Sequence, residues 1–126
     1  MKKTMKKLLC AVLAAATLGT CSMGVSAEES YLLGDVNKDG VVDADDANKV
    51  LYEYLRVGVL EEEPEFTEEE FALANVYPDN LLNADDSDVI LCYYLYTIMG
   101  GKQMTVTEFF ESGLYFQGYE EGWNFK

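Results

Sequence analysis

The feature that most constrains this chain is a run of oxygen-bearing side chains across residues 35–46, Asp-Val-Asn-Lys-Asp-Gly-Val-Val-Asp-Ala-Asp-Asp. In a twelve-residue loop, oxygens at this spacing surround one hard cation, which takes about six to eight of them. Gly40 at position 6 permits the sharp turn that brings the position-7 carbonyl inward. The pattern predicts a Ca2+ site whose ligands are Asp35, Asn37, Asp39, the carbonyl of Val41, Asp43 and Asp46.

Two details separate this loop from an ordinary EF-hand. Position 12 is Asp46, where Glu is usual. Little chain precedes the loop to form an entering helix once residues 1–27 are removed. An acidic surface loop without a metal is the alternative interpretation.

Residues 1–27 are expected to be a secretory signal peptide. Four lysines come first, and the apolar segment from Leu8 to Leu18 that follows is too short to span a bilayer. Val25-Ser26-Ala27 is a small-x-small cleavage site. A transmembrane segment is a less favoured alternative. A lipoprotein anchor at Cys21 is also less favoured, because Thr20 fits poorly just before the cysteine.

Cleavage after Ala27 would leave one small, strongly acidic domain. Its net charge would be −18, because 23 acidic and five basic residues remain. This charge argues against nucleic acids and anionic membranes as partners. Cys92 would be the only cysteine, so no intramolecular disulfide could form. A bound metal would then supply the stabilisation that small secreted domains often take from disulfides.

The sequence repeats when it is shifted by 40 residues, so that Asp43-Ala44-Asp45-Asp46 aligns with Asn83-Ala84-Asp85-Asp86. Residues 75–86 therefore form a second loop in the same register. This loop is degraded, since Asn75 replaces an aspartate, Tyr77 occupies position 3 and Asn80 replaces the glycine. Affinity follows the charge and number of ligands. We expect a tight first site and a second loop that is weak or keeps its shape without metal.

Apolar residues at helical spacing predict that each loop runs into a helix, over residues 44–56 and 87–99. Gly58 is expected to end the first helix, and Gly100-Gly101 the second. The two apolar stripes are expected to pack against each other with the helices antiparallel. They comprise Ala47, Val50, Leu51, Tyr54 and Leu55, and Val89, Ile90, Leu91, Tyr94, Leu95 and Ile98.

The acidic segment between these helices contains a capping box, Thr67-x-x-Glu70, which predicts a short helix from Glu68 to about Asn75 that buries Phe71 and Leu73. The glutamates of this segment are expected to form a solvated face. Attraction of a basic partner is the alternative. The expected fold class is all-α.

A duplicated Asp-x-Asn-x-Asp-Gly-x-Val-Asp-x-x-Asp loop followed directly by a helix, behind a signal peptide, resembles a type I dockerin. The resemblance covers roughly residues 33–100 and is closer in the first repeat. It implies a duplicated calcium loop–helix (F-hand) fold with a short connecting helix. It also implies binding to a cohesin module on a scaffoldin-type protein, in an extracellular or cell-surface polysaccharide-degrading complex of a bacterium. In the second repeat it implies the ligands Asn75, Asp79, the carbonyl of Leu81, Asn83 and Asp86.

The resemblance also implies which residues contact the cohesin. Type I dockerins commonly carry Ser-Thr and basic residues at these positions, whereas this chain has Ala-Asp and apolar residues, so we expect a different class of cohesin. Similar contact sets in the two halves would permit two binding orientations. The contact residues are Ala44, Asp45, Leu51, Tyr52, Ala84, Asp85, Leu91 and Cys92.

Residues 102–126 lie outside the repeat and contain seven aromatic residues, too many for a disordered tail. They are expected to pack on the dockerin-like domain, near Tyr31 and Leu32. The alternative is an exposed aromatic strip that binds sugar or a second protein. The expected layout is thus a signal peptide at 1–27, a dockerin-like domain at 28–101 with repeats at about 34–58 and 74–100, and an extension at 102–126.

The expected function is calcium-dependent protein–protein interaction rather than catalysis. The chain has no histidine, its one cysteine after residue 27 has no base to activate it, and no enzyme module is attached. We expect a monomer when the protein is free. Two alternatives remain: a secreted calcium-binding protein of the same fold with a non-cohesin partner, and an accessory sugar-binding protein that acts through its C-terminal aromatics.

Overall fold

The computed structural model describes residues 30–125, so the expected signal segment lies outside the described residues. The described chain contains helices and no strand, which confirms the all-α class. The elements are α2 (Ala44–Tyr54), η1 (Leu55–Val59), α3 (Glu68–Ala74), α4 (Ala84–Ile98), α5 (Val106–Glu111) and α6 (Leu114–Glu120).

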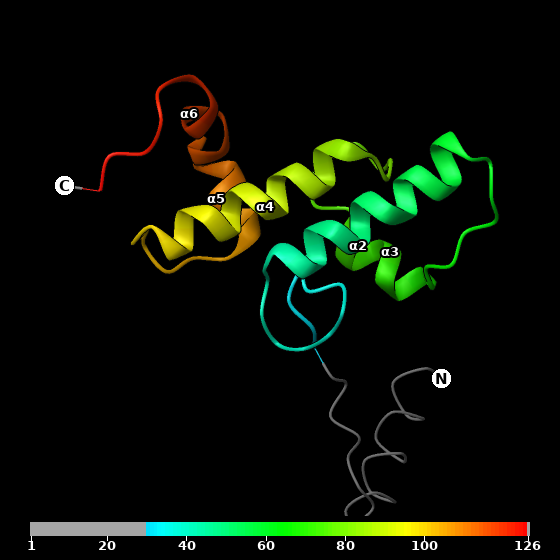
Figure 1. The fold of residues 1–126 in the computed structure, drawn as a ribbon. Coiled ribbons are helices and arrows are strands. Elements are labelled where there is room, and N and C mark those ends of the chain that lie inside the picture. The colour runs from blue at the N-terminus through cyan, green and yellow to red at the C-terminus, as the bar shows by residue number, and fades with distance from the viewer. Residues whose placement is uncertain (1–29, 126) are drawn as a thin grey trace, which may run out of the picture. The chain divides into compact units, whose positions relative to one another are not determined.

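Helices α2 and α4 lie side by side and run in opposite directions (Figure 1). At their contact, the buried Ser87 hydroxyl donates a hydrogen bond of 2.7 Å to the Ala47 carbonyl. Ser87 and Ala47 occupy equivalent positions in the two repeats, so α2 and α4 contact each other through equivalent residues. Val50, Val89 and Ile90 are fully buried around this contact and form the centre of the core.

The predicted apolar stripes are only half buried. Leu51, Leu55, Leu91 and Leu95 are exposed, whereas carboxylates that sequence periodicity assigns to the surface point inward. Asp46 and Asp86 turn inward to bind the loops, and Glu53 turns inward to hold the segment before α3. The outer leucines of both stripes therefore lie on the surface, as does Ile98 at the end of α4, which is 60% exposed.

Helix α2 does not end at Gly58 as expected. The backbone continues as the π-helical segment η1 through Val59, and Glu61, with φ of 57°, makes the left-handed turn instead. Gly58 allows close packing rather than a turn, because a Cβ there would lie 3.0 Å from the Tyr54 ring. The end of α4 agrees with expectation, since Gly100 follows its last turn with φ of 95°.

Helix α3 begins at the predicted capping box of Thr67 and Glu70. Leu73 packs partly against the core and Ala74 is fully buried, but Phe71 is 39% exposed, so its predicted burial is wrong. The helix is short, and its buried face is set by Leu73, whose carbonyl accepts a hydrogen bond of 2.8 Å from the Gly34 amide. Phe71 is left at the rim.

Residues 102–125 pack on α4 (Figure 1). Phe109 of α5 is fully buried, and its ring lies 5.3 Å from that of Tyr96 and 5.8 Å from that of Tyr93. Trp123 stacks edge-on against Tyr96 at 5.6 Å, and its indole N–H donates to the Leu114 carbonyl. These contacts make the C-terminal segment part of the same core as the repeats.

The carboxylate of Glu53 offers a direct test of this architecture. It is buried and accepts hydrogen bonds from the amides of Glu65 (2.7 Å) and Phe66 (3.0 Å). The Glu53→Ala variant should lose about 1–3 kcal/mol of unfolding free energy in urea denaturation, because both amides lose their partner. Glu53→Gln should lose less, since an amide oxygen still accepts. The control Glu62→Ala removes an exposed partner of Arg56 and should cost no more than about 1 kcal/mol. Equal losses in Glu53→Ala and Glu62→Ala would contradict this account.

Candidate functional site

Loop 1, residues 35–46, closes around two buried carboxylates. Asp35 accepts hydrogen bonds from the amides of Asp39 (3.0 Å) and Gly40 (2.9 Å). Asp46 reaches back from the first turn of α2 to accept from the amide of Val36 (2.8 Å), and it also accepts from the amides of Asn37 and Asp43 at 3.0 Å. Asp35 is 1% exposed and Asp46 is fully buried. The loop therefore carries negative charge inside its own turn.

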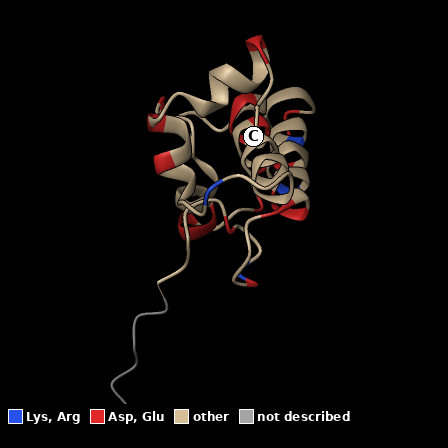
Figure 2. Cartoon of the chain, turned by 90° about the vertical axis from the view of Figure 1, so that its left-hand side faces the viewer, with Lys and Arg blue, Asp and Glu red and all other residues tan. Residues whose placement is uncertain are grey.

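The electrostatics of loop 1 favour a cation. Burial raises the pKa of the Asp46 carboxyl above its usual value; hydrogen bonds from the backbone oppose this, and the nearby Asp35 charge adds to it. The ion pairs of the described residues use glutamates as acceptors, with Lys38 to Glu69 and Lys49 to Glu70. No aspartate of loop 1 takes part in them. Figure 2 shows the same imbalance across the described chain, with acidic segments on the loops and helices and few basic ones.

The donor set of loop 1 consists of oxygens only, which suits a hard cation such as Ca2+. Across residues 30–125, however, no three acidic, cysteine or histidine side chains are gathered closely enough to hold a metal ion between them. Instead, the side chains hold the loop's own amides: Asp39 accepts from Val41, and Asp43 accepts from Asp45. Only the oxygen chemistry of these residues and their order along the turn match a hard cation.

Loop 2, residues 75–86, repeats part of this arrangement. Asp86 is fully buried and accepts from the amides of Tyr77 (2.9 Å) and Asn83 (3.0 Å), as Asp46 does in loop 1. Asp79 accepts from the Leu81 amide and from the Asn83 side chain. Asn80 adopts a left-handed φ of 59°, matching Gly40 at 88°. Loop 2 therefore keeps the left-handed turn although Asn80 replaces the glycine.

Position 3 of loop 2 is not a ligand position. The ring of Tyr77 packs edge-on against Phe110 of α5, with ring centroids 5.2 Å apart. Asn75 Oδ1, at position 1, is the buried side-chain atom that has no hydrogen-bond partner among the described residues. Asp35, its equivalent in loop 1, holds two amides. Loop 2 thus lacks one ligand and part of the internal support that loop 1 has.

The expected partner-contact residues lie at the starts and outer faces of α2 and α4. In the first repeat, Ala44 is half-buried, Asp45 and Leu51 are exposed, and Tyr52 is 64% exposed. In the second repeat, Ala84, Asp85 and Leu91 are exposed, but Cys92 is half-buried.

Sequence reasoning missed two neighbours of these residues on the same surface, Leu55 and Leu95, both of which are exposed. It assigned them to the core because they continue the helical stripe.

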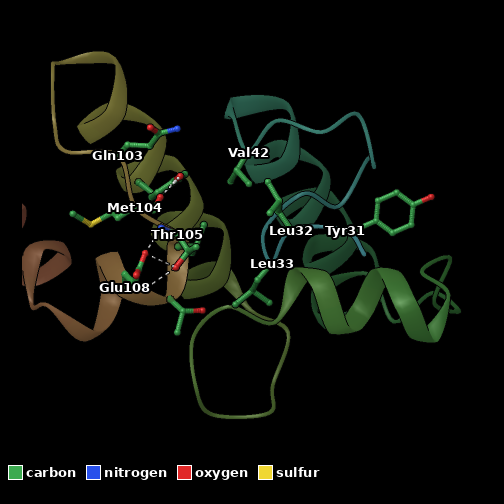
Figure 3. A pocket seen from close by; sticks show the side chains of 11 residues that line it. Tyr31, Leu32, Leu33, Val42, Gln103, Met104, Thr105 and Glu108 are labelled. Atoms are coloured by element: carbon green, nitrogen blue, oxygen red, sulfur yellow. Dashed lines mark hydrogen bonds between the residues drawn. The ribbon is translucent and has the colours of Figure 1, made fainter. Parts of the chain in front are cut away.

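A separate crevice of about 490 Å³ lies between the N-terminal segment and the turn before α5 (Figure 3). In Figure 3, Leu32, Leu33 and Val42 face Met104 and Thr105 across it, while Tyr31 points away. Thr105 and Glu108 form the capping box of α5 along one wall. The crevice is open and lacks a charged cluster, so it does not suggest a chemistry of its own.

No family model matches the chain, and no curated protein matches it. Within residues 30–125, no helix has both the length and the apolar character needed to cross a bilayer.

The turn at position 6 can be tested by substitution. Gly40 is left-handed and a Cβ there would meet nothing within 4 Å, so Gly40→Ala isolates the conformational cost. In buffer with EDTA, Gly40→Ala should lose about 1–2 kcal/mol of unfolding free energy. Asn80→Ala should lose less unfolding free energy, because Asn80 in the parent chain already carries part of the cost of a left-handed backbone. Equal stability of Gly40→Ala and the parent chain in urea denaturation would show that the turn is not held in this conformation.

Proposed function

We propose that this protein is a dockerin-like module that binds a cohesin on a scaffoldin-type protein in a calcium-dependent manner, outside a bacterial cell. The observation that carries the proposal is loop 1, where Asp35 and Asp46 are buried in a turn of oxygen donors without a basic partner among the described residues. Backbone amides offset part of the cost of burying these two carboxylates, but no opposite charge does so among the described residues. A Ca2+ ion held by loop 1 would supply that charge.

The proposed cation holders in loop 1 are the residues predicted from its spacing. Asp46 belongs to both the loop and the first turn of α2, so ordering the loop also fixes the start of the helix. The outer face of α2 then presents Leu51 and Tyr52 on a rigid element, which reduces the ordering cost of binding. The full set is Asp35, Asn37, Asp39, the carbonyl of Val41, Asp43 and Asp46.

The use of the C-terminal aromatics favours this proposal over a sugar-binding function. Phe109 and Tyr115 are buried, and Trp123 is engaged by Tyr96 and by the Leu114 carbonyl. A sugar-binding strip needs its flat rings on the surface, whereas Phe109 and Tyr115 are in the core and Trp123 is partly buried; Phe116, Tyr119 and Phe125 are the exposed rings of this segment. A non-cohesin partner for the same calcium-dependent face is the remaining alternative.

Calorimetric titration with Ca2+ should detect one equivalent of tightly bound Ca2+ per chain, called here the tight equivalent. Asp39→Ala should weaken it by tenfold or more, since affinity follows ligand charge and number. Asp79→Ala is the matched control, because Asp79 occupies the same position of loop 2 and should leave the tight equivalent unchanged. If Asp79→Ala loses the tight equivalent and Asp39→Ala keeps it, the tight site belongs to loop 2 and not to loop 1. Absence of any tight equivalent would remove calcium from the proposal.

Binding to cohesin modules of the source organism, with Ca2+ and again with EDTA, tests the partner. We expect at least one cohesin to bind with Ca2+ and to be released by EDTA, because loop 1 anchors the binding helix. Binding that persists in EDTA would contradict the calcium dependence. A folded protein that binds no cohesin would favour the non-cohesin alternative.

A further inference from the structure

The two repeats are not equally open to a partner, because helices α5 and α6 lie on the second one. We infer that the C-terminal extension, residues 102–125, is a built-in occupant of the second repeat, docked on Tyr77 and on the stripe of α4 at Asp88 and Cys92, so that a partner binds through the first repeat alone. This inference rests on the proposed function for the identity of the partner. The docking itself is independent of that identity.

The first docking point is in loop 2. Tyr77 contacts Phe110 edge-on at 5.2 Å, and Phe110 in turn lies 5.7 Å from Tyr115 and 5.6 Å from Phe116. Edge-to-face pairs of this kind stabilise beyond their buried area. The residue that departs most from the loop pattern is therefore the one that the extension uses. Tyr77 at position 3 is thus a contact residue for α5.

The second docking point is on α4, two residues after the end of loop 2. Asp88 accepts hydrogen bonds from the hydroxyls of Tyr115, at 3.0 Å, and Tyr119. Both tyrosines have a raised pKa, to about 12 for Tyr119, where the hydrogen bond to Asp88 is the largest cause. Helix α6 thus contacts α4 at Asp88. Cys92 lies one turn further along α4 and is half-buried against the core to which Tyr115 belongs.

The equivalent stripe of the first repeat is open. Asn48 and Tyr52 are the residues of α2 that match Asp88 and Cys92, and both are exposed. No residue of the described chain is hydrogen-bonded to the side chain of either. Tyr52 and Cys92 were expected to contact a partner in the same way. Their surroundings differ, since Cys92 is half-buried beside the residue that holds α6, whereas Tyr52 is 64% exposed.

Alkylation of Cys92 reports whether the extension is docked. The full chain is treated with iodoacetamide, and the rate is read from the peptide that contains Cys92 by mass spectrometry, so that Cys10 and Cys21 do not interfere. In Tyr115→Phe/Tyr119→Phe the rate should rise about fivefold or more, because the hydroxyls that hold α6 to Asp88 are lost. Tyr119→Phe alone is the milder variant and should give a smaller rise.

Tyr52→Phe is the matched control for this measurement. Tyr52 and Tyr119 are both 64% exposed, but Tyr52 lies on the open repeat and should leave the alkylation rate of Cys92 unchanged. An unchanged rate in both Tyr119→Phe and the double variant, with the chains still folded, would overturn the docking. A similar rise in Tyr52→Phe would also overturn it.

The restriction to one repeat is tested with a cohesin that binds in the presence of Ca2+. Leu51 is 36% exposed and Leu91 is 37% exposed at the equivalent position, so they form a matched pair. Leu51→Ala should weaken binding about tenfold, as expected for loss of a contact near an interface centre, and Leu91→Ala should change it less than about twofold. Equal losses would overturn the restriction.

The two tests separate the inference from the function on which it rests. A chain that binds no cohesin contradicts the proposed function, whereas the alkylation rates still decide whether the extension is docked on the second repeat. A chain that binds cohesin equally through both leucines supports the function and contradicts the inference.

Discussion

The fold depends on one buried carboxylate at the start of each long helix. Asp46 and Asp86 occupy the third position of α2 and α4, where each completes a capping box and reaches back to amides at the beginning of its loop. One side chain thus fixes where the loop closes and where the helix begins. Replacing either carboxylate would leave buried amides without partners, and such amides destabilise a fold more than the lost bond itself stabilised it.

The two repeats share this carboxylate but differ in the other contacts that stabilise their loops. Loop 1 keeps an aspartate at position 1 that holds two amides, whereas loop 2 has Asn75, whose buried oxygen has no hydrogen-bond partner among residues 30–125. Loop 2 gains support from outside, because Tyr77 packs on Phe110. A duplicated unit can lose part of its internal bonding when another segment supplies the missing contacts. The second repeat has done this with an aromatic contact.

Local chemistry made much of this structure predictable. The loop turns and the capping box of α3 follow from short-range patterns, and apolar periodicity located α2 and α4 to within a few residues, although α4 begins at Ala84 rather than at residue 87. Burial was harder to predict. Leu51 and Leu91 were assigned to the packed stripe as well as to the partner surface, and both are exposed, whereas Glu53 and the loop carboxylates Asp46 and Asp86 are buried. The contact of Tyr77 with Phe110 joins residues 33 positions apart, and no local pattern specifies such a pairing.

The start of the extension resembles the segment that opens α3, although it lies outside the 40-residue repeat. Thr67-x-x-Glu70-Phe71 opens α3, and Thr105-x-x-Glu108-Phe109 opens α5 with the same capping box. Each segment is tied to the preceding long helix by an equivalent position, since Glu53 accepts amides before α3 and the Tyr93 hydroxyl donates to the Met104 carbonyl before α5. The difference lies in the phenylalanine, which is at the rim in α3 and fully buried in α5. A connecting segment can therefore become a docking element through deeper burial of one aromatic side chain.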